Sequence, residues 1–293
     1  MRRADVARLA ALAMIWSASF VFIRVLAPAL GPMWVATSRV LIGGGALVLW
    51  FAVTGFDAEV RRHWRAYLVV GILNSALPFV LYAYAALHLP ASYMVILNAS
   101  LPLFGALASA VWLADSLTPP KLAGLTAGVA GVALVSRAGP VVPDATFAVA
   151  VAACLAATVC YALAGVWLKR RGAGLKPMAV AGWSQLLAGV VLLPFAATTT
   201  APAPWSAVVV ANVLGLALVC SAIAYLLYYR LIAEVGPTRA MTVSFLMPAF
   251  GMLWGAIFLA ETITLPMVAG CALIVGGTFA VLRPLRATLR PAA

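Results

Sequence analysis

Apolar residues form long runs along this chain, and short polar segments separate the runs. A helix that crosses the ~30 Å hydrocarbon core of a bilayer needs about 20 such residues. A helix also satisfies its own backbone hydrogen bonds in lipid, and the alternating pattern of a membrane barrel is absent. The pattern predicts ten membrane-spanning helices, over residues 8–27, 33–53, 66–87, 91–113, 119–137, 147–168, 177–197, 206–229, 238–259 and 266–282.

Composition supports this assignment, because 66% of the 293 residues are apolar and only 9% are charged. A soluble domain carries roughly 25% charged residues. The net charge of +12 could suggest nucleic acid, but the basic residues sit in short loops between apolar runs, so we expect no nucleic-acid partner. The four cysteines fall inside apolar segments and lack the spacing of metal ligands. We expect no metal, no cofactor and no catalytic residues, because the predicted spans hold no nucleophile with a base.

Positive charge predicts the orientation in the membrane. If the N-terminus is cytoplasmic, all 19 basic residues except Arg24, Arg39 and Arg137 fall in cytoplasmic segments. We therefore expect a multi-pass protein of the bacterial inner membrane with both termini in the cytoplasm.

The chain also contains an internal repeat. Many residues match in type at an offset of 146, among them Ser75 and Ser221, Tyr82 and Tyr228, Pro102 and Pro248, Asp115 and Glu261, and Gly131 and Gly277. Each half holds five predicted spans, and because five is odd the second half must enter the membrane from the opposite side. We predict a first five-helix repeat over residues 1–138, an inverted repeat over 146–283 and a cytoplasmic tail over 284–293.

Inverted repeats are typical of secondary transporters, in which two similar halves exchange conformations. A channel can also carry such a repeat, but the ring of ligating groups that a channel needs is not evident. A duplication kept only for stability is the remaining alternative. Alternating access is the favoured interpretation, with channel-like facilitation as the alternative.

The ordered motifs of both halves resemble the drug/metabolite transporter superfamily of the EamA type. The first half has an aromatic residue in the first span, then proline, arginine, a proline-containing fourth span and an acid: Trp16, Pro32, Arg39, Pro102 and Asp115. The second half follows with Tyr161, Pro177, Pro248 and Glu261, but has Ser184 where the arginine would fall. The resemblance covers nearly the whole chain. Within this superfamily, the chain is similar to bacterial amino-acid exporters of the YddG kind. The resemblance implies ten helices around a central cavity.

Candidate cavity residues follow from matched faces of the predicted helices. In the third span, residues four apart share one face, and the eighth span repeats the polar and aromatic pattern. These two spans contribute Asn74, Pro78, Phe79, Tyr82, Ser221, Tyr225 and Tyr228. Tyr82 and Tyr228 lie near opposite ends of their spans, which suggests an outer and an inner gate; an interfacial aromatic belt is the alternative.

Two further groups belong to the candidate site. The first group consists of two mid-membrane prolines and a polar residue four positions before each: Asn98 and Pro102, and Ser244 and Pro248. A proline within a helix frees a backbone carbonyl, which is tolerated at a cavity; a structural kink is the alternative. Trp16, Ser17, Phe20 and Tyr161 lie in the first span of each half, where aromatic side chains could stack on a substrate or simply pack in the core.

Charged residues inside or beside the spans have two interpretations each. Arg39 could attract a substrate carboxylate, or it could snorkel to the membrane surface or be held by helix carbonyls. Asp115 and Glu261 precede helix starts, so we expect each to accept amide protons from the helix that follows it; proton coupling is the alternative.

These observations predict a monomeric secondary transporter whose partners are a small-molecule substrate and the lipid bilayer. We expect it to export amino acids, including aromatic ones, or related metabolites; cationic drugs and other metabolites are the alternative cargo.

Overall fold

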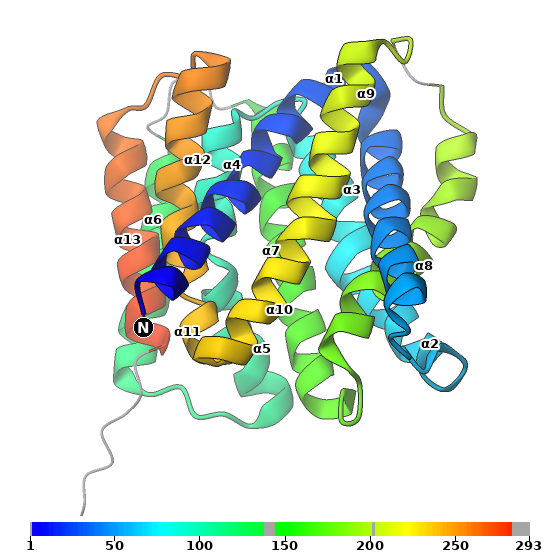
Figure 1. The fold of residues 1–293 in the computed structure, drawn as a ribbon. Helices are drawn as coiled ribbons and strands as arrows, with labels where there is room; N and C mark the ends of the chain where they lie inside the picture. The colour runs from blue at the N-terminus through cyan, green and yellow to red at the C-terminus, as the bar shows by residue number, and fades with distance from the viewer. Residues whose placement is uncertain (1, 138–143, 201–202, 283–293) are drawn as a thin grey trace, which may run out of the picture.

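The computed structural model describes residues 2–137, 144–200 and 203–282, and every regular element in these ranges is a helix. Seven helices in the described ranges are long and apolar enough to cross a membrane, and the 17-residue helix Val243–Leu259 is shorter but also apolar. Figure 1 shows them packed side by side as a bundle. The predicted tail 284–293 lies outside the described residues.

The first helix is far longer than one membrane crossing. Helix α1 covers Arg3–Thr54, and its backbone is non-helical at Gly31, where φ is 75° and ψ is 158°. Glycine adopts a positive φ without a steric penalty, and Pro32 lacks the N–H that a continuous helix would use. In Figure 1 the first segment of α1 rises from the N-terminus and the second descends beside α8. The predicted spans 8–27 and 33–53 correspond to these two segments.

The rest of the first half, which we take as residues 2–137, consists of helices with local irregularities. They are α2 (Val60–Gly71), the π-helical η1 (Ile72–Ala76), α3 (Leu77–Ala85), α4 (Ala91–Asn98), α5 (Leu101–Leu113) and α6 (Pro119–Arg137). The first three form one continuous helical segment over residues 60–85, and α4 and α5 together cover residues 91–113.

The second half, residues 144–282, follows a similar order. Its elements are α7 (Ala145–Arg171), α8 (Pro177–Ala197), α9 (Ala207–Leu214), the π-helical η2 (Gly215–Ile223), α10 (Ala224–Val235), α11 (Pro237–Ala240), α12 (Val243–Leu259) and α13 (Leu265–Leu282). The positions that lie 146 after η1, residues 218–222, thus fall within the π-helical η2. Ala114 and Ala260, also 146 positions apart, both adopt the left-handed conformation, with φ of 55° and 52°.

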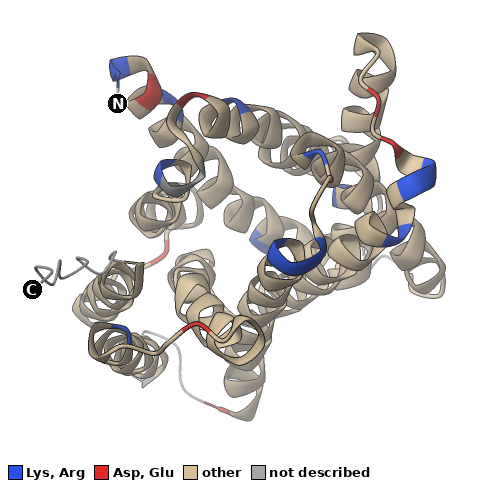
Figure 2. Ribbon diagram, turned by 90° about the horizontal axis from the view of Figure 1, so that it is seen from below, with Lys and Arg blue, Asp and Glu red and all other residues tan. Residues whose placement is uncertain are grey.

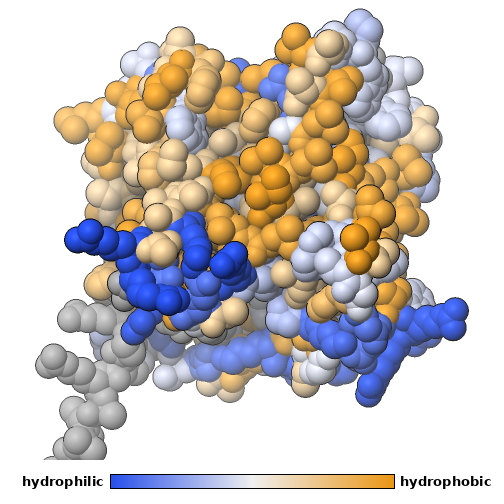
Figure 3. Space-filling model, viewed as in Figure 1, coloured by the Kyte–Doolittle hydropathy of each residue, from blue (hydrophilic) through white to orange (hydrophobic). Residues whose placement is uncertain are grey.

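Large apolar side chains cover much of the outer surface. Leu265 is 81% exposed, and Val111, Val129 and Phe258 also lie on the outside of the bundle. Figure 3 shows one such apolar flank, with hydrophilic residues gathered along its lower edge. Exposed apolar area of this extent is stable against lipid rather than water, so the chain is a multi-pass membrane protein.

Helices α6 and α13 approach so closely that glycine is required at their contact. A Cβ atom on Gly124 would lie 2.5 Å from the Gly277 carbonyl oxygen, and one on Gly131 would lie 2.6 Å from the Gly270 carbonyl oxygen. Small residues let membrane helices pack backbone to backbone. Gly124 and Gly131 of α6 therefore pack against α13 of the same chain.

Glu261 contacts a helix of the other half, whereas the sequence predicts a contact with the helix that follows it. Its carboxylate accepts the Ala91 amide at 2.6 Å and the Ser92 amide at 2.9 Å, at the N-terminus of α4 rather than of the following helix α13. Asp115 instead pairs with Lys169 at 3.6 Å. The position that corresponds to Ala91 in the second half is Pro237, which has no N–H to donate, so Asp115 has no equivalent pair of amides to accept.

We predict that Gly277→Ala destabilises the protein, because the new methyl group would press on the Gly124 carbonyl. Overpacking of this kind costs about 1–3 kcal/mol. The matched control is Gly276→Ala, one residue away on the same helix, where a Cβ meets no atom within 4 Å. Thermal unfolding of the purified protein in detergent should show a lower midpoint for the first variant alone, and equal midpoints would contradict the contact.

We also predict that Glu261→Gln is destabilising by about 1–2 kcal/mol, because one of two helix amides would then face an NH₂ group instead of an acceptor. Asp115→Asn serves as the control, since an exposed ion pair contributes ~0–1 kcal/mol. The same unfolding measurement compares them. If Asp115→Asn lowers the unfolding midpoint as much as Glu261→Gln does, the Glu261 contacts at the N-terminus of α4 stabilise the protein no more than an exposed ion pair.

Candidate solute cavity

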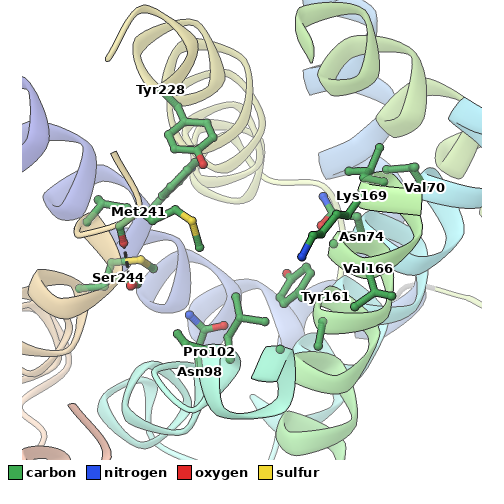
Figure 4. A pocket seen from close by; sticks show the side chains of 18 of the residues that line it. Val70, Asn74, Asn98, Pro102, Tyr161, Val166, Lys169, Tyr228, Met241 and Ser244 are labelled. Carbon is green, nitrogen blue, oxygen red and sulfur yellow. Dashed lines mark hydrogen bonds between the residues drawn. The ribbon is translucent and has the colours of Figure 1, made fainter. Parts of the chain in front are cut away.

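A cavity of about 740 Å³ lies among the helices, and α1 to α8, α10, α12, α13 and η1 all contribute lining residues. Figure 4 shows Asn74, Asn98, Pro102, Tyr161, Tyr228 and Ser244 around it, from helices of both halves. Pockets for small organic ligands are typically ~300–1,000 Å³. The space therefore suits a solute of the size of an amino acid.

Most of the residues that the sequence selected meet at this cavity. Its walls include Trp16, Phe20, Arg39, Asn74, Phe79, Tyr82, Asn98, Pro102, Tyr161, Tyr225, Tyr228 and Ser244. Four selected residues do not line it and are buried behind it: Ser17, Pro78, Ser221 and Pro248. Of these, Ser221 still contacts the site, because it binds the Arg39 side chain.

The cavity reaches one end of the molecule. The lining residues Asp115, Lys121, Lys169, Met241 and Leu282 lie at or near the ends of α5, α6, α7, α11 and α13, and Lys169 and Asp115 form an ion pair there. Figure 2 views the molecule from this end, where Lys and Arg positions lie at several helix ends. The mouth thus opens on the side that the charge pattern assigns to the cytoplasm.

Three side chains that contact one another line the cavity towards the other end, and we interpret them as its closure. The Tyr82 hydroxyl donates to Asn98 Oδ1 at 2.9 Å, and the Phe20 ring packs edge-on against the Tyr82 ring at 5.3 Å between centroids. Tyr82 is only 2% exposed. We call Phe20, Tyr82 and Asn98 the closing triad.

The corresponding positions of the second half form no such closure in the described structure. They are Gly165, Tyr228 and Ser244, by the offsets of 145 and 146. Gly165 offers no side chain, and the Ser244 hydroxyl donates to the Met241 carbonyl instead of meeting Tyr228. The open mouth and the closed end therefore differ in the residues that occupy equivalent positions.

An aromatic group covers the wall nearest the mouth. Trp16 packs against Tyr228 at 5.1 Å and Tyr225 at 6.1 Å, and Tyr229 stacks on Tyr225 at 6.3 Å between ring centroids. Aromatic faces of this kind bind other rings by stacking and cations by their quadrupole. The wall can therefore receive an aromatic or apolar side chain together with an ammonium group.

Arg39 projects into the bundle, so snorkelling to the membrane surface is the wrong interpretation. Its side chain is buried, with Nε donating to Ser221 Oγ at 3.1 Å and its guanidinium carbon 3.9 Å from the Phe79 ring centroid. A hydroxyl and an aromatic face hold it, rather than the helix carbonyls that the sequence suggested. Arg39 itself lines the cavity.

Sequence reasoning missed several wall residues: Ser19, Lys169, Ser184 and Tyr229. Tyr229 is four positions after Tyr225, and i,i+4 neighbours share a helix face, so the pattern contained its signal. Ser19 likewise follows Trp16 by three positions. Lys169 lies one residue beyond the predicted span 147–168, but α7 continues to Arg171 and carries it at the mouth. Among the described residues, no group of three or more His, Cys, Asp or Glu side chains could hold a metal ion.

Comparison with known proteins identifies related sequences over nearly the whole chain. The model of the EamA-like transporter family matches twice, over residues 6–137 and 148–283. The uncharacterized transporter YvbV of Bacillus subtilis is 28% identical over 83% of this chain and 80% of its own. A probable terminal-alkyne amino-acid exporter of Streptantibioticus cattleyicolor is 25% identical, over 92% of this chain and 90% of its own.

Protein PecM of Dickeya dadantii is 27% identical, over 89% of this chain and 86% of its own. One solved crystal structure superposes with a TM-score of 0.67 over 96% of both chains, at 19% sequence identity. That likeness shows a shared fold.

Proposed function

The chain belongs to the EamA-like transporter family, and from this premise we propose that it exports amino acids, including aromatic ones, or related metabolites across the bacterial inner membrane by alternating access. The observation that carries the proposal is the single-sided cavity. It opens among basic helix ends and is closed at its other end by the closing triad. A carrier needs such a state to load solute from one side without conducting to the other.

The proposed mechanism uses ten membrane crossings in two inverted repeats. Gly31 supports two crossings within α1, because it bends a helix of 52 residues. Reciprocal contacts support the repeat: Trp16 packs on Tyr228, and their counterparts Tyr161 and Tyr82 pack on each other. A pseudo-two-fold relation between the halves produces paired contacts of this kind, and it allows the two halves to exchange conformations.

The charge of the cavity favours amino acids over the alternative of cationic drugs. Of the charged residues that line it in the described part of the chain, Arg39, Lys121 and Lys169 are basic and Asp115 is acidic. A wall of this charge raises the local concentration of anionic groups and repels cations. The relative named as a probable amino-acid exporter supports the same class of cargo.

The orientation is proposed from charge. The basic end carries the open mouth, and cytoplasmic loops of membrane proteins are enriched in Lys and Arg. With that end in the cytoplasm, the structure represents the inward-open state, ready to accept solute for export.

Transport should be measurable with the purified protein in proteoliposomes. We expect counterflow of amino acids such as phenylalanine, and none of a cationic dye, because the cavity carries excess positive charge. Empty liposomes and the variant Asn74→Leu, which replaces a polar wall residue, are the controls. Flux of the dye but not of amino acids would overturn the proposed cargo. Single-channel currents would mean that the protein is a channel rather than a carrier.

Alternating access predicts opposite reactivity at two equivalent positions outside the closing triad. Val95 is 0% exposed, whereas Met241, 146 positions later, is 48% exposed at the mouth. In a cysteine-free background, Met241→Cys should react with a membrane-impermeant thiol reagent from the cytoplasmic side and Val95→Cys should be protected. Adding Asn98→Ala, which removes the acceptor for Tyr82, should raise reactivity at 95 and lower it at 241.

The control for this experiment is Ser206→Ala, since Ser206 caps α9 away from the cavity and should leave both rates unchanged. Simultaneous reactivity at positions 95 and 241 in every condition would indicate an open pore.

A further inference from the structure

We propose that Arg39 is the specificity-determining residue of the cavity: its terminal amino groups bind the carboxylate of the solute, and the Trp16–Tyr225 wall binds the solute's apolar or aromatic part. This inference rests on the proposed function, because it names the recognition element of the same cavity.

The first argument is the lack of a counter-ion for Arg39. All seven Asp and Glu side chains lie in the described residues, and none of them forms an ion pair with Arg39. A buried charge is costly unless a partner of opposite charge or several hydrogen bonds compensate it. A ligand carboxylate entering the cavity would supply that partner.

The second argument is the geometry of the guanidinium. The Phe79 ring covers one face and Ser221 occupies Nε, so the side chain is fixed in orientation. The two terminal amino groups make no hydrogen bond with the described residues. A guanidinium presents its N–H groups as a planar fork that matches the two oxygens of a carboxylate. Arg39 is thus preorganised, with the fork left for a ligand.

The third argument is the distance to the aromatic wall. Ser221, which holds Arg39, precedes Tyr225 by four positions, which is about one helical turn, or ~5.4 Å. Trp16 packs against Tyr225 and continues the wall. A solute with a carboxylate and an apolar group a few bonds apart would reach both at once. An ammonium group would find aromatic faces and neutral oxygens there rather than an acid, which suits a zwitterion but not a dication.

The fourth argument is that the position is not duplicated. The counterpart of Arg39 in the second half is Ser184, which also lines the cavity. The counterpart of Ser221 is Ser75, whose buried hydroxyl has no partner among the described residues. A purely structural brace between α1 and η2 would be needed equally between α8 and η1. The second half packs without it, so holding the helices together does not require the guanidinium.

The test is binding by the full-length protein in nanodiscs, measured by isothermal titration calorimetry with four probes that differ at the charged groups. They are phenylalanine, its deaminated analogue 3-phenylpropionate, its decarboxylated analogue phenethylamine, and phenylalaninamide. We expect the wild-type protein to bind the two carboxylates about tenfold or more tightly than the two others. Equal affinity for all four probes, or binding of none, would overturn the proposal without recourse to any variant.

Variants then test whether Arg39 causes the preference for probes that carry a carboxylate. Arg39→Gln should weaken binding of both carboxylates by about tenfold or more while changing the amine and amide affinities by less than about twofold, and Arg39→Lys should restore part of the preference. Lys169→Gln is the matched control, because it removes a cavity charge at the mouth and should affect all anions weakly. Equal loss for all four probes in folded Arg39→Gln would assign Arg39 a structural role and overturn the proposal.

Flux separates this inference from the proposed function. Carboxylate binding that depends on Arg39, together with no counterflow in proteoliposomes, would remove the export function and leave the binding site in place. Counterflow of phenylalanine and phenethylamine at equal rates would retain transport and overturn the role of Arg39.

Discussion

A chain embedded in lipid must satisfy its backbone hydrogen bonds internally, and departures from the α-helix are tolerated only where they meet protein or a water-filled space. Three irregular segments of this protein follow that rule. The π-helical η1 contains the wall residue Asn74, the break after Asn98 precedes the wall residues Leu101 and Pro102, and the break before α12 carries Met241. At these three places, wall residues of the cavity lie in or beside the irregular segment. The π-helical η2 provides no wall residue, but its Ser221 binds the side chain of the wall residue Arg39.

Close helix packing supplies the rigidity around this space. At the periphery α6 and α13 meet through glycines, and Glu261 fixes the start of α4 to the other half. The cavity walls, in contrast, meet through aromatic rings and single hydrogen bonds such as that between Tyr82 and Asn98. Interactions of the second kind can break and re-form at little cost, so motion is expected at the walls rather than at the glycine contacts.

The sequence predicted the helical fold well because a helix in lipid must be a long apolar run, and because proline and charged residues separate these runs. It also placed a break between the spans 8–27 and 33–53, where the backbone of α1 is non-helical at Gly31. The expected role of Glu261 was wrong because charge and helix polarity predict that an acid meets a helix N-terminus, but not which helix. The partner, α4, comes from the other half and is known only from the tertiary packing.

For the candidate site, helical periodicity predicted which faces turn inward but not which residue on a face reaches the space. Pro78 and Pro248 are buried and do not line the cavity, whereas Pro102, also a proline within a helix, does. The role of Ser221 also differs from the one predicted: it contacts Arg39 rather than the cavity. No spacing rule connects residues 39 and 221, because their contact depends on how α1 and η2 pack.

The position of Arg39 connects recognition to conformational change. Its side chain belongs to α1 and rests on Phe79 of α3 in the first half, while its hydrogen-bond partner Ser221 belongs to η2 in the second half. A carboxylate held there, with its apolar part against Tyr225, would contact both halves simultaneously. Its binding energy would then depend on how the halves are placed relative to each other. A ligand shifts a conformational equilibrium only by its difference in affinity for the two states, and a site shared between the halves is the arrangement that creates such a difference.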